Sequence, residues 1–148
     1  MNYLFDTDSV CFLYNTASKN HEAILSRLSS SSDADSFLIS GLTLFELEYS
    51  LSMAPESKKT EIRNIIIDAK EDFLVVSLKN EVAGIYGQLK AEMKRQKKVK
   101  PENMKKHNID LMIAGTAILE GCILVSSDSV YKEIQFVNPD FRHENWTV

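Results

Sequence analysis

The stretch LFDTD (residues 4–8) sets an apolar run directly against two carboxylates. The run has the composition of a short buried strand, so Asp6 and Asp8 follow at the strand's carboxyl end. Sites in open α/β sheets form outside the carboxyl ends of the strands. Carboxylates placed there can hold a cation, act as a nucleophile or cap the next turn, and the other acids of the chain decide between these roles.

The rest of the chain alternates between two patterns. Short apolar runs predict buried strands at residues 2–6, 37–40, 73–77, 122–126 and 134–137. Apolar residues spaced by three and four predict helices at residues 21–28, 42–53, 61–69, 78–93 and 110–119. This alternation is typical of an α/β fold with a mostly parallel five-stranded sheet and helices on both faces. We expect residues 1–148 to form one such domain, large enough to bury a core.

The composition favours a soluble protein of a reducing compartment. Of the 148 residues, 44% are hydrophobic and 26% are charged. No apolar stretch approaches the roughly 20 residues that span a bilayer, and no signal peptide is recognisable, so we expect a cytoplasmic protein without a membrane partner. Cys11 and Cys122 are isolated in or beside apolar segments, which predicts free core thiols.

The net charge of −4 hides a basic segment. Residues 90–106 hold eight Lys or Arg and two Glu, a local charge of +6, which leaves −10 for the remainder. Such a segment can attract a polyanion such as a nucleic acid, or it can be the solvated end of a helix with its loop.

Three further acids stand in contexts that resemble the first. Asp128 follows the predicted strand at 122–126, and Glu46 lies in the apolar surroundings TLFELEYSL, where an unpaired carboxylate is costly. Asp110 opens a predicted helix, where an acid also serves as a cap. Because this helix leads into the 122–126 strand, we expect its start at the far edge of the sheet, although the sequence does not fix where Asp110 points.

Four converging carboxylates predict a divalent cation, because without one their repulsion forces some of them to protonate. Oxygen-only ligands favour Mg²⁺, or Mn²⁺, over zinc. Mg²⁺ commonly bridges to substrate phosphate, so an acidic cluster beside a basic segment predicts cleavage of a phosphodiester by metal-activated water.

The four contexts, LFDTD, SGLTLFELEYSL, NIDLMIAGTAILEG and ILVSSDSVYKEI, resemble the ordered motifs of PIN-domain ribonucleases. The likeness is to VapC-type toxins of bacterial toxin–antitoxin pairs, and it runs from Asn2 to Trp146. It implies a PIN-like three-layer sandwich and a Mg²⁺-dependent endoribonuclease that leaves a 5′-phosphate and a 3′-hydroxyl. It also implies a protein antitoxin and a homodimer.

The resemblance assigns roles to individual residues. The catalytic and metal-binding acids match Asp6, Glu46, Asp110 and Asp128, with Asp6 and Asp110 as direct ligands. A hydroxyl that often precedes the fourth acid matches Ser126 or Ser127. We assign RNA binding to the chain's own basic stretch and this hydroxyl, that is, to Lys97, Lys98, Lys100 and Ser127. The chain departs from the family pattern at Asp8, at Ser50 and in the long basic stretch 97–107.

Two alternatives stay open at this point. FDTDSV also looks like the first motif of haloacid-dehalogenase-like phosphatases, with Asp6 as nucleophile and Asp8 as general acid–base. That family needs a further lysine and a late pair of acids, and it leaves Glu46 and Asp110 without a role. The second alternative is a non-catalytic module that binds Mg²⁺ and RNA.

Overall fold

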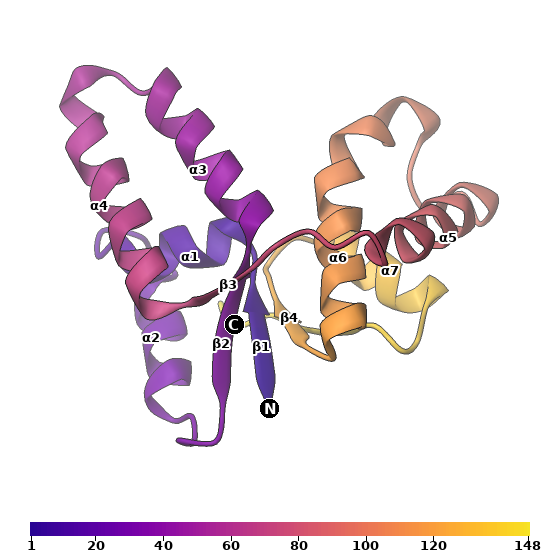
Figure 1. The fold of residues 1–148 in the computed structure, drawn as a ribbon, viewed down its shortest axis with the longest axis horizontal. Helices are drawn as coiled ribbons and strands as arrows, with labels where there is room; N and C mark the ends of the chain where they lie inside the picture. The colour runs from indigo at the N-terminus through magenta and orange to yellow at the C-terminus, as the bar shows by residue number, and fades with distance from the viewer.

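The computed structural model describes residues 1–148 (Figure 1). Its centre is a five-stranded sheet in the order β3-β2-β1-β4-β5, in which all four pairings are parallel. The strands are β1 (Asn2–Phe5), β2 (Ser36–Ser40), β3 (Leu74–Val76), β4 (Ile123–Val125) and β5 (Arg142–Glu144). The predicted five-stranded α/β fold is therefore confirmed, and its sheet is parallel throughout.

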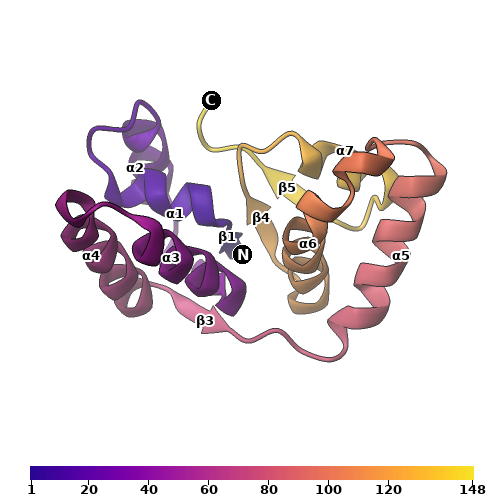
Figure 2. The ribbon, with the colours of Figure 1, turned by 90° about the horizontal axis from the view of Figure 1, so that it is seen from above.

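Seven α-helices and two short 3₁₀ turns connect the strands. They are α1 (Thr7–Tyr14), α2 (His21–Ser29), α3 (Gly41–Met53), α4 (Glu56–Asp72), α5 (Val82–Arg95), η1 (Pro101–Asn103), η2 (Lys105–His107), α6 (Asn108–Glu120) and α7 (Val130–Val137). Helices α1 to α4 lie on one side of the sheet and α5 to α7 on the other (Figures 1 and 2).

Alternation along the central strands builds a separate core on each face of the sheet. Leu4 and Leu124 pack with α5, α6 and α7 in one cluster. Phe5 and Val125, their neighbours in sequence, pack with α1 to α4 in the other cluster. Because both faces are covered, these strands have continuous apolar sequences rather than an alternating pattern. The result is the predicted three-layer sandwich.

The strand order places a topological switch point between β1 and β4. From β1 the chain builds outward through β2 to β3, then crosses over and adds β4 and β5 on the other side of β1. The loops after β1 and β4 consequently leave the sheet in opposite directions and open a crevice at its carboxyl edge, the position where open parallel sheets bind ligands. Asp6 and Ser126 are the first residues after these two strands.

One predicted element is wrong, and two elements of the structure were not predicted. Residues 134–137, predicted as a strand, belong to α7, because Ile134 shares one buried helical face with Val130 and Tyr131. The fifth strand is instead the short, polar β5, whose sequence RHE carries no apolar signal. Helix α1, with the sequence TDSVCFLY, was also not predicted; Asp6 caps it by accepting a hydrogen bond from the Ser9 amide.

The two cysteines do not form a disulfide. Cys11 and Cys122 are both free thiols, and Cys122 is buried as expected. Burial raises the pKa of Cys11 to about 11, so the thiol stays protonated and inert near neutral pH. None of the helices combines the length and the apolar character that crossing a bilayer requires.

Candidate active site

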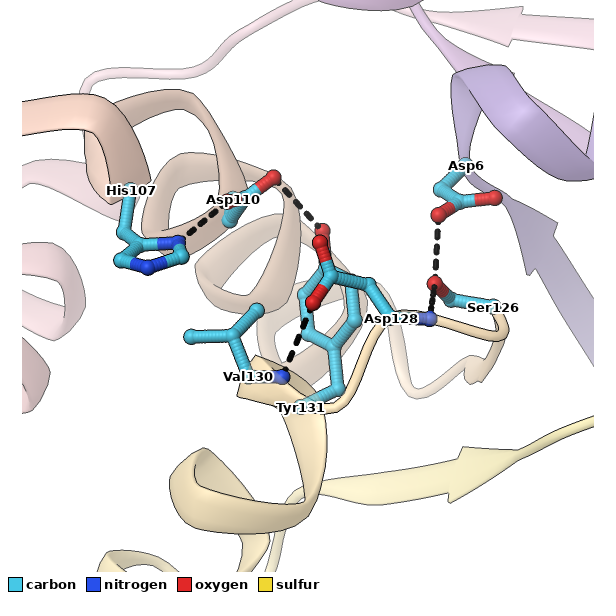
Figure 3. Close-up of polar contacts among 7 residues, drawn as sticks. All are labelled: Asp6, His107, Asp110, Ser126, Asp128, Val130 and Tyr131. Atoms are coloured by element: carbon cyan, nitrogen blue, oxygen red, sulfur yellow. Dashed lines mark hydrogen bonds and ion pairs between the residues drawn. The ribbon is translucent and has the colours of Figure 1, made fainter. Parts of the chain in front are cut away.

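Asp6 is held at the switch point by hydrogen bonds to both carboxylate oxygens. The Ser9 amide donates to Oδ1 at 2.9 Å, and the Ser126 hydroxyl donates to Oδ2 (Figure 3). Only 7% of Asp6 is exposed. Burial raises its pKa to about 6, although the bonds from Ser126 and Ser9 act in the opposite direction. Asp6 is thus a rigidly held carboxylate whose ionised form is disfavoured by its surroundings.

Glu46 reaches the same edge from the second turn of α3. The Thr7 hydroxyl donates to Glu46 Oε1 at 2.6 Å and so ties α3 to the residue that follows Asp6. Burial raises the pKa of Glu46, with Asp110 and Asp8 adding to the rise, while the bond from Thr7 lowers it. Oε2 is not engaged by any hydrogen bond within the chain, which leaves it available for a ligand.

Asp110 lies at the carboxyl edge as well, which corrects the expectation that α6 starts at the far edge. A helix that feeds a parallel strand runs antiparallel to it, and the 13 residues of α6 span about 20 Å. Its end therefore meets the start of β4, and its first turn reaches the edge where β4 ends. Nδ1 of His107 lies 2.9 Å from Oδ2, and the Tyr131 hydroxyl donates to Oδ1 at 3.4 Å (Figure 3).

Asp128 follows β4 in a turn that also orients Ser126. The Asp128 amide donates to Ser126 Oγ at 3.0 Å, and Asp128 Oδ1 accepts from the Val130 amide at 3.0 Å (Figure 3). Ser126 therefore receives one hydrogen bond and donates its own proton to Asp6. Of the two hydroxyls considered for this role, Ser126 makes these contacts, whereas Ser127 is exposed.

One cavity of about 430 Å³ is lined by all four acids, together with Asp8 from the first turn of α1. No lysine or arginine lines it. Burial raises the pKa of Asp8, and the charges of Asp128 and Asp110 raise it further. Carboxylates from segments distant in sequence thus face one uncompensated space, a pattern that marks functional sites more often than structural ones.

The chemistry of this lining fits a hard divalent cation, since it offers oxygen donors only. The carboxylates line the cavity without closing on one point, because no group of three or more Asp, Glu, His or Cys side chains is arranged as a metal site.

Two of the four predicted RNA-binding residues line a cavity next to the acids, and the other two do not. Lys98 and Lys100 line a second cavity of about 600 Å³, with Lys106 beside them, and this cavity shares Asp110 and Asp128 with the first. Lys97 and Ser127 line neither cavity. Lys98 is also partly engaged, because its Nζ lies 3.7 Å from Glu133 and 3.6 Å from the centre of the Phe136 ring.

Sequence reasoning missed three residues that orient the acids: Thr7, His107 and Tyr131. Thr7 lies between the two acids of LFDTD, and His107 precedes Asp110 by three positions, so its contact is visible as an i, i+3 pair once the helix is known. Tyr131 is 1% exposed yet keeps its hydroxyl on Asp110. Its pKa is raised well above the ordinary value by burial and by the surrounding carboxylates.

A family model described as "PIN domain" matches residues 3–137. This match covers most of the chain, so the protein belongs to the PIN-domain family. The resemblance to VapC-type proteins noted in the sequence agrees with the fold, because chains of solved VapBC complexes have the same fold. No curated protein matches the chain.

Solved structures with the same fold include chains of VapBC complexes. VapBC2 from Rickettsia felis, bound to a DNA fragment from its promoter, aligns with a TM-score of 0.77 and 24% identity over 99% of both chains. VapBC-1 from nontypeable Haemophilus influenzae aligns with a TM-score of 0.76 and 22% identity over 100% of both chains. VapBC-5 from Mycobacterium tuberculosis, from a family of toxin–antitoxin systems, aligns with a TM-score of 0.71 and 11% identity over 97% of this chain and 98% of that one.

Proposed function

We propose that residues 1–148 form one nuclease domain, a Mg²⁺-dependent endoribonuclease that hydrolyses RNA phosphodiester bonds; Mn²⁺ is the alternative metal. The observation that carries the proposal is the single cavity lined by Asp6, Glu46, Asp110 and Asp128 at the switch point of a parallel sheet. Membership of the PIN-domain family supports the same class of activity.

The four acids would hold the cation, with Asp6 and Asp110 as the direct ligands and Glu46 and Asp128 completing the set. A bound Mg²⁺ lowers the pKa of its water and offsets negative charge on the phosphate. The chain's own contribution is orientation. Ser126 and the Ser9 amide fix Asp6, Thr7 fixes Glu46, and His107 with Tyr131 fixes Asp110. A carboxylate oxygen that remains free, such as Glu46 Oε2, is placed to accept a proton from the attacking water.

The RNA backbone would extend from the four acids into the second cavity. Lys98, Lys100 and Lys106 line it, and each can pair with a phosphate. We assign substrate binding to these lysines, with Lys97 and Ser127 at the periphery of the path. Because the two cavities share Asp110 and Asp128, a phosphate held by the lysines would lie next to the reacting one.

Membership of the PIN-domain family overturns the phosphatase alternative. The cavity agrees with this correction, because a haloacid-dehalogenase-like site needs a lysine and none lines the space around Asp6 and Asp8. The non-catalytic module differs from the proposed function only in turnover. It predicts metal and RNA binding without new RNA ends.

We further propose that the protein is the toxin of a toxin–antitoxin pair, that it acts in the cytoplasm as a homodimer and that a protein antitoxin inhibits it. The solved VapBC structures with the same fold support this biological role.

The test is cleavage of a total RNA pool by the purified protein in Mg²⁺, with the new ends mapped. The proposal expects 5′-phosphate ends that disappear in EDTA and in Asp110→Asn. Asp140→Asn is the matched control and should cleave normally, because Asp140 is exposed and lies just before β5, whose start pairs with the start of β4 at the edge of the sheet opposite the site. Metal and RNA binding without any cleavage would establish the non-catalytic module instead.

A further inference from the structure

One wall of the acidic cavity is formed by two exposed aromatic side chains. Phe45 and Tyr49 on α3 line it together with the carboxylates. Phe45 is 74% exposed and Tyr49 is 68% exposed. Helix α3 stands across the carboxyl edge from α6, which carries Asp110 (Figure 2). The two aromatic residues therefore share α3 with Glu46 and line the cavity across from the helix that carries Asp110.

These two rings contribute nothing evident to the fold. The other aromatic rings close to the sheet pack against one another, as Tyr3 does with Phe37 and Tyr131 with Phe141, whereas Phe45 and Tyr49 stack on no ring of the chain. Leaving a ring in water forgoes about 25 cal/mol for each Å² that burial would remove. Residues spaced by four on a helix are neighbours, so the two rings present one continuous apolar face.

The opposite side of the acids has a different character. Beyond Asp110 and Asp128 lies the second cavity with Lys98, Lys100 and Lys106. Along the site, therefore, the order is an aromatic pair, then carboxylates, then lysines. A ligand that spans this order needs apolar flat groups at one end and negative charges at the other, and it needs a reactive group between them.

We infer that Phe45 and Tyr49 form a stacking platform for an unpaired base of the RNA, next to the phosphodiester that is cut. This inference rests on the proposed function and deepens it. Aromatic side chains stack on splayed bases of single-stranded RNA, whereas a duplex keeps its bases stacked on each other and inaccessible to side chains. The platform makes the enzyme select single-stranded segments, and it holds one side of the cut by base contacts while lysines hold the other side by phosphate contacts.

A protein partner is the competing occupant of this surface. Met53, 68% exposed, continues the same face of α3 one turn beyond Tyr49 but does not line the cavity. A protein that covered the helix would use all three side chains, whereas a base beside the acids uses only the two that line the cavity. Met53→Ala is consequently the matched control.

The experiment compares two fluorescent 12-nucleotide RNA probes, oligoadenylate and the same chain with its three central bases removed. Both carry the same phosphates. Binding is measured by anisotropy in Mg²⁺, in an Asp6→Asn background that slows cleavage. We expect the platform to bind oligoadenylate about tenfold more tightly than the abasic probe, a scale set by base–aromatic stacking. Combined Phe45→Ala and Tyr49→Ala should abolish this preference without changing the salt dependence. Tyr49→Phe and Met53→Ala should keep the preference.

Equal binding of the two probes by the unmodified platform would overturn the inference, as would a preference that persists when both rings are removed. A change in sedimentation mass shared by Phe45→Ala and Met53→Ala, with base preference intact, would overturn it in favour of a protein interface. Cleavage by the otherwise wild-type chain is scored separately. If the protein cleaves RNA but shows no base preference, only the stacking inference is wrong. If it does not cleave RNA, the proposed function is wrong.

Discussion

Replacing Asp6 with Asn should stabilise the metal-free protein at neutral pH. Asp6 is buried, and its pKa is raised to about 6 from an ordinary 3.8. At 1.36 kcal/mol per pKa unit, the ionised side chain costs the fold about 3 kcal/mol above pH 6. Asn has nearly the same shape, keeps an oxygen for the Ser9 amide and caps a helix as well as Asp does. The substitution removes the charge, but its amide nitrogen replaces Oδ2 and leaves the Ser126 hydroxyl without that acceptor, which offsets about 1 kcal/mol of the gain.

The sign of the effect depends on pH. Above about pH 6 Asp6 is ionised in both folded and unfolded states, so the full cost is present and the Asn variant has its greatest advantage. As the pH falls from about 6 to about 4, the folded protein takes up the proton first and the cost fades. With the lost Ser126 contact included, the advantage of the Asn variant should be about 2 kcal/mol at pH 7.5, fall to about zero at pH 4.5 and reverse below the ordinary pKa.

Urea unfolding in EDTA at pH 7.5 and pH 4.5 measures both values. Asp35→Asn is the control of opposite sign, because a hydrogen bond from the Ser32 amide lowers the pKa of Asp35, and removing its charge should destabilise the protein at pH 7.5. Adding Mg²⁺ should stabilise wild type more than Asp6→Asn, since the ion binds the folded site. An Asp6→Asn variant that is less stable than wild type in EDTA at pH 7.5 would refute the reasoning.

Three further outcomes follow from the structure. Asp110→Asn should reduce the cleavage rate at least about 10²-fold, measured under single-turnover conditions, because it removes charge and a ligand at the reacting phosphate; near-normal turnover at low Mg²⁺ would contradict this role. Replacing Lys98, Lys100 and Lys106 with Gln should flatten the dependence of log Kd on log salt by about 0.7 for each phosphate that is no longer neutralised, whereas Lys70→Gln, exposed on α4 and outside both cavities, should leave the slope unchanged. Gly115→Ala should destabilise the fold by about 1–3 kcal/mol in urea unfolding, since its Cβ would meet Val82 Cγ1 at 2.9 Å, while Gly84→Ala, which meets nothing within 4 Å, should be neutral or stabilising.

Much of the fold was predictable because its signals are local. The apolar runs that became β1, β2 and β4, and the helical spacing of α3 and α6, are buried as their sequences suggest. Helix α7 was mistaken for a strand because a short apolar run such as residues 134–137 satisfies both periods. Strand β5 was missed because an edge strand of three polar residues is held by backbone pairing with β4 and has no side-chain signal.

The site was predictable in composition but not in detail. Asp6 and Asp128 follow strands, and Glu46 and Asp110 lie in the first two turns of helices; the parallel topology then gathers these four positions at one edge. The direction of α6 was misjudged, since sequence order was considered without the antiparallel run of a helix against the strand it feeds. The contacts of Thr7 with Glu46 and of Tyr131 with Asp110 join residues 39 and 21 positions apart, which no local pattern specifies.

The central claim is that the four carboxylates act together on one divalent ion. Mn²⁺ binding, followed by electron paramagnetic resonance of the free ion, tests this most directly. The account predicts saturable binding by wild type, competed by Mg²⁺ and strongly weakened by each of Asp6→Asn, Glu46→Gln and Asp110→Asn, with Asp140→Asn unchanged. Mn²⁺ binding that is unaffected by these three substitutions, or absent from the wild-type protein, would contradict it.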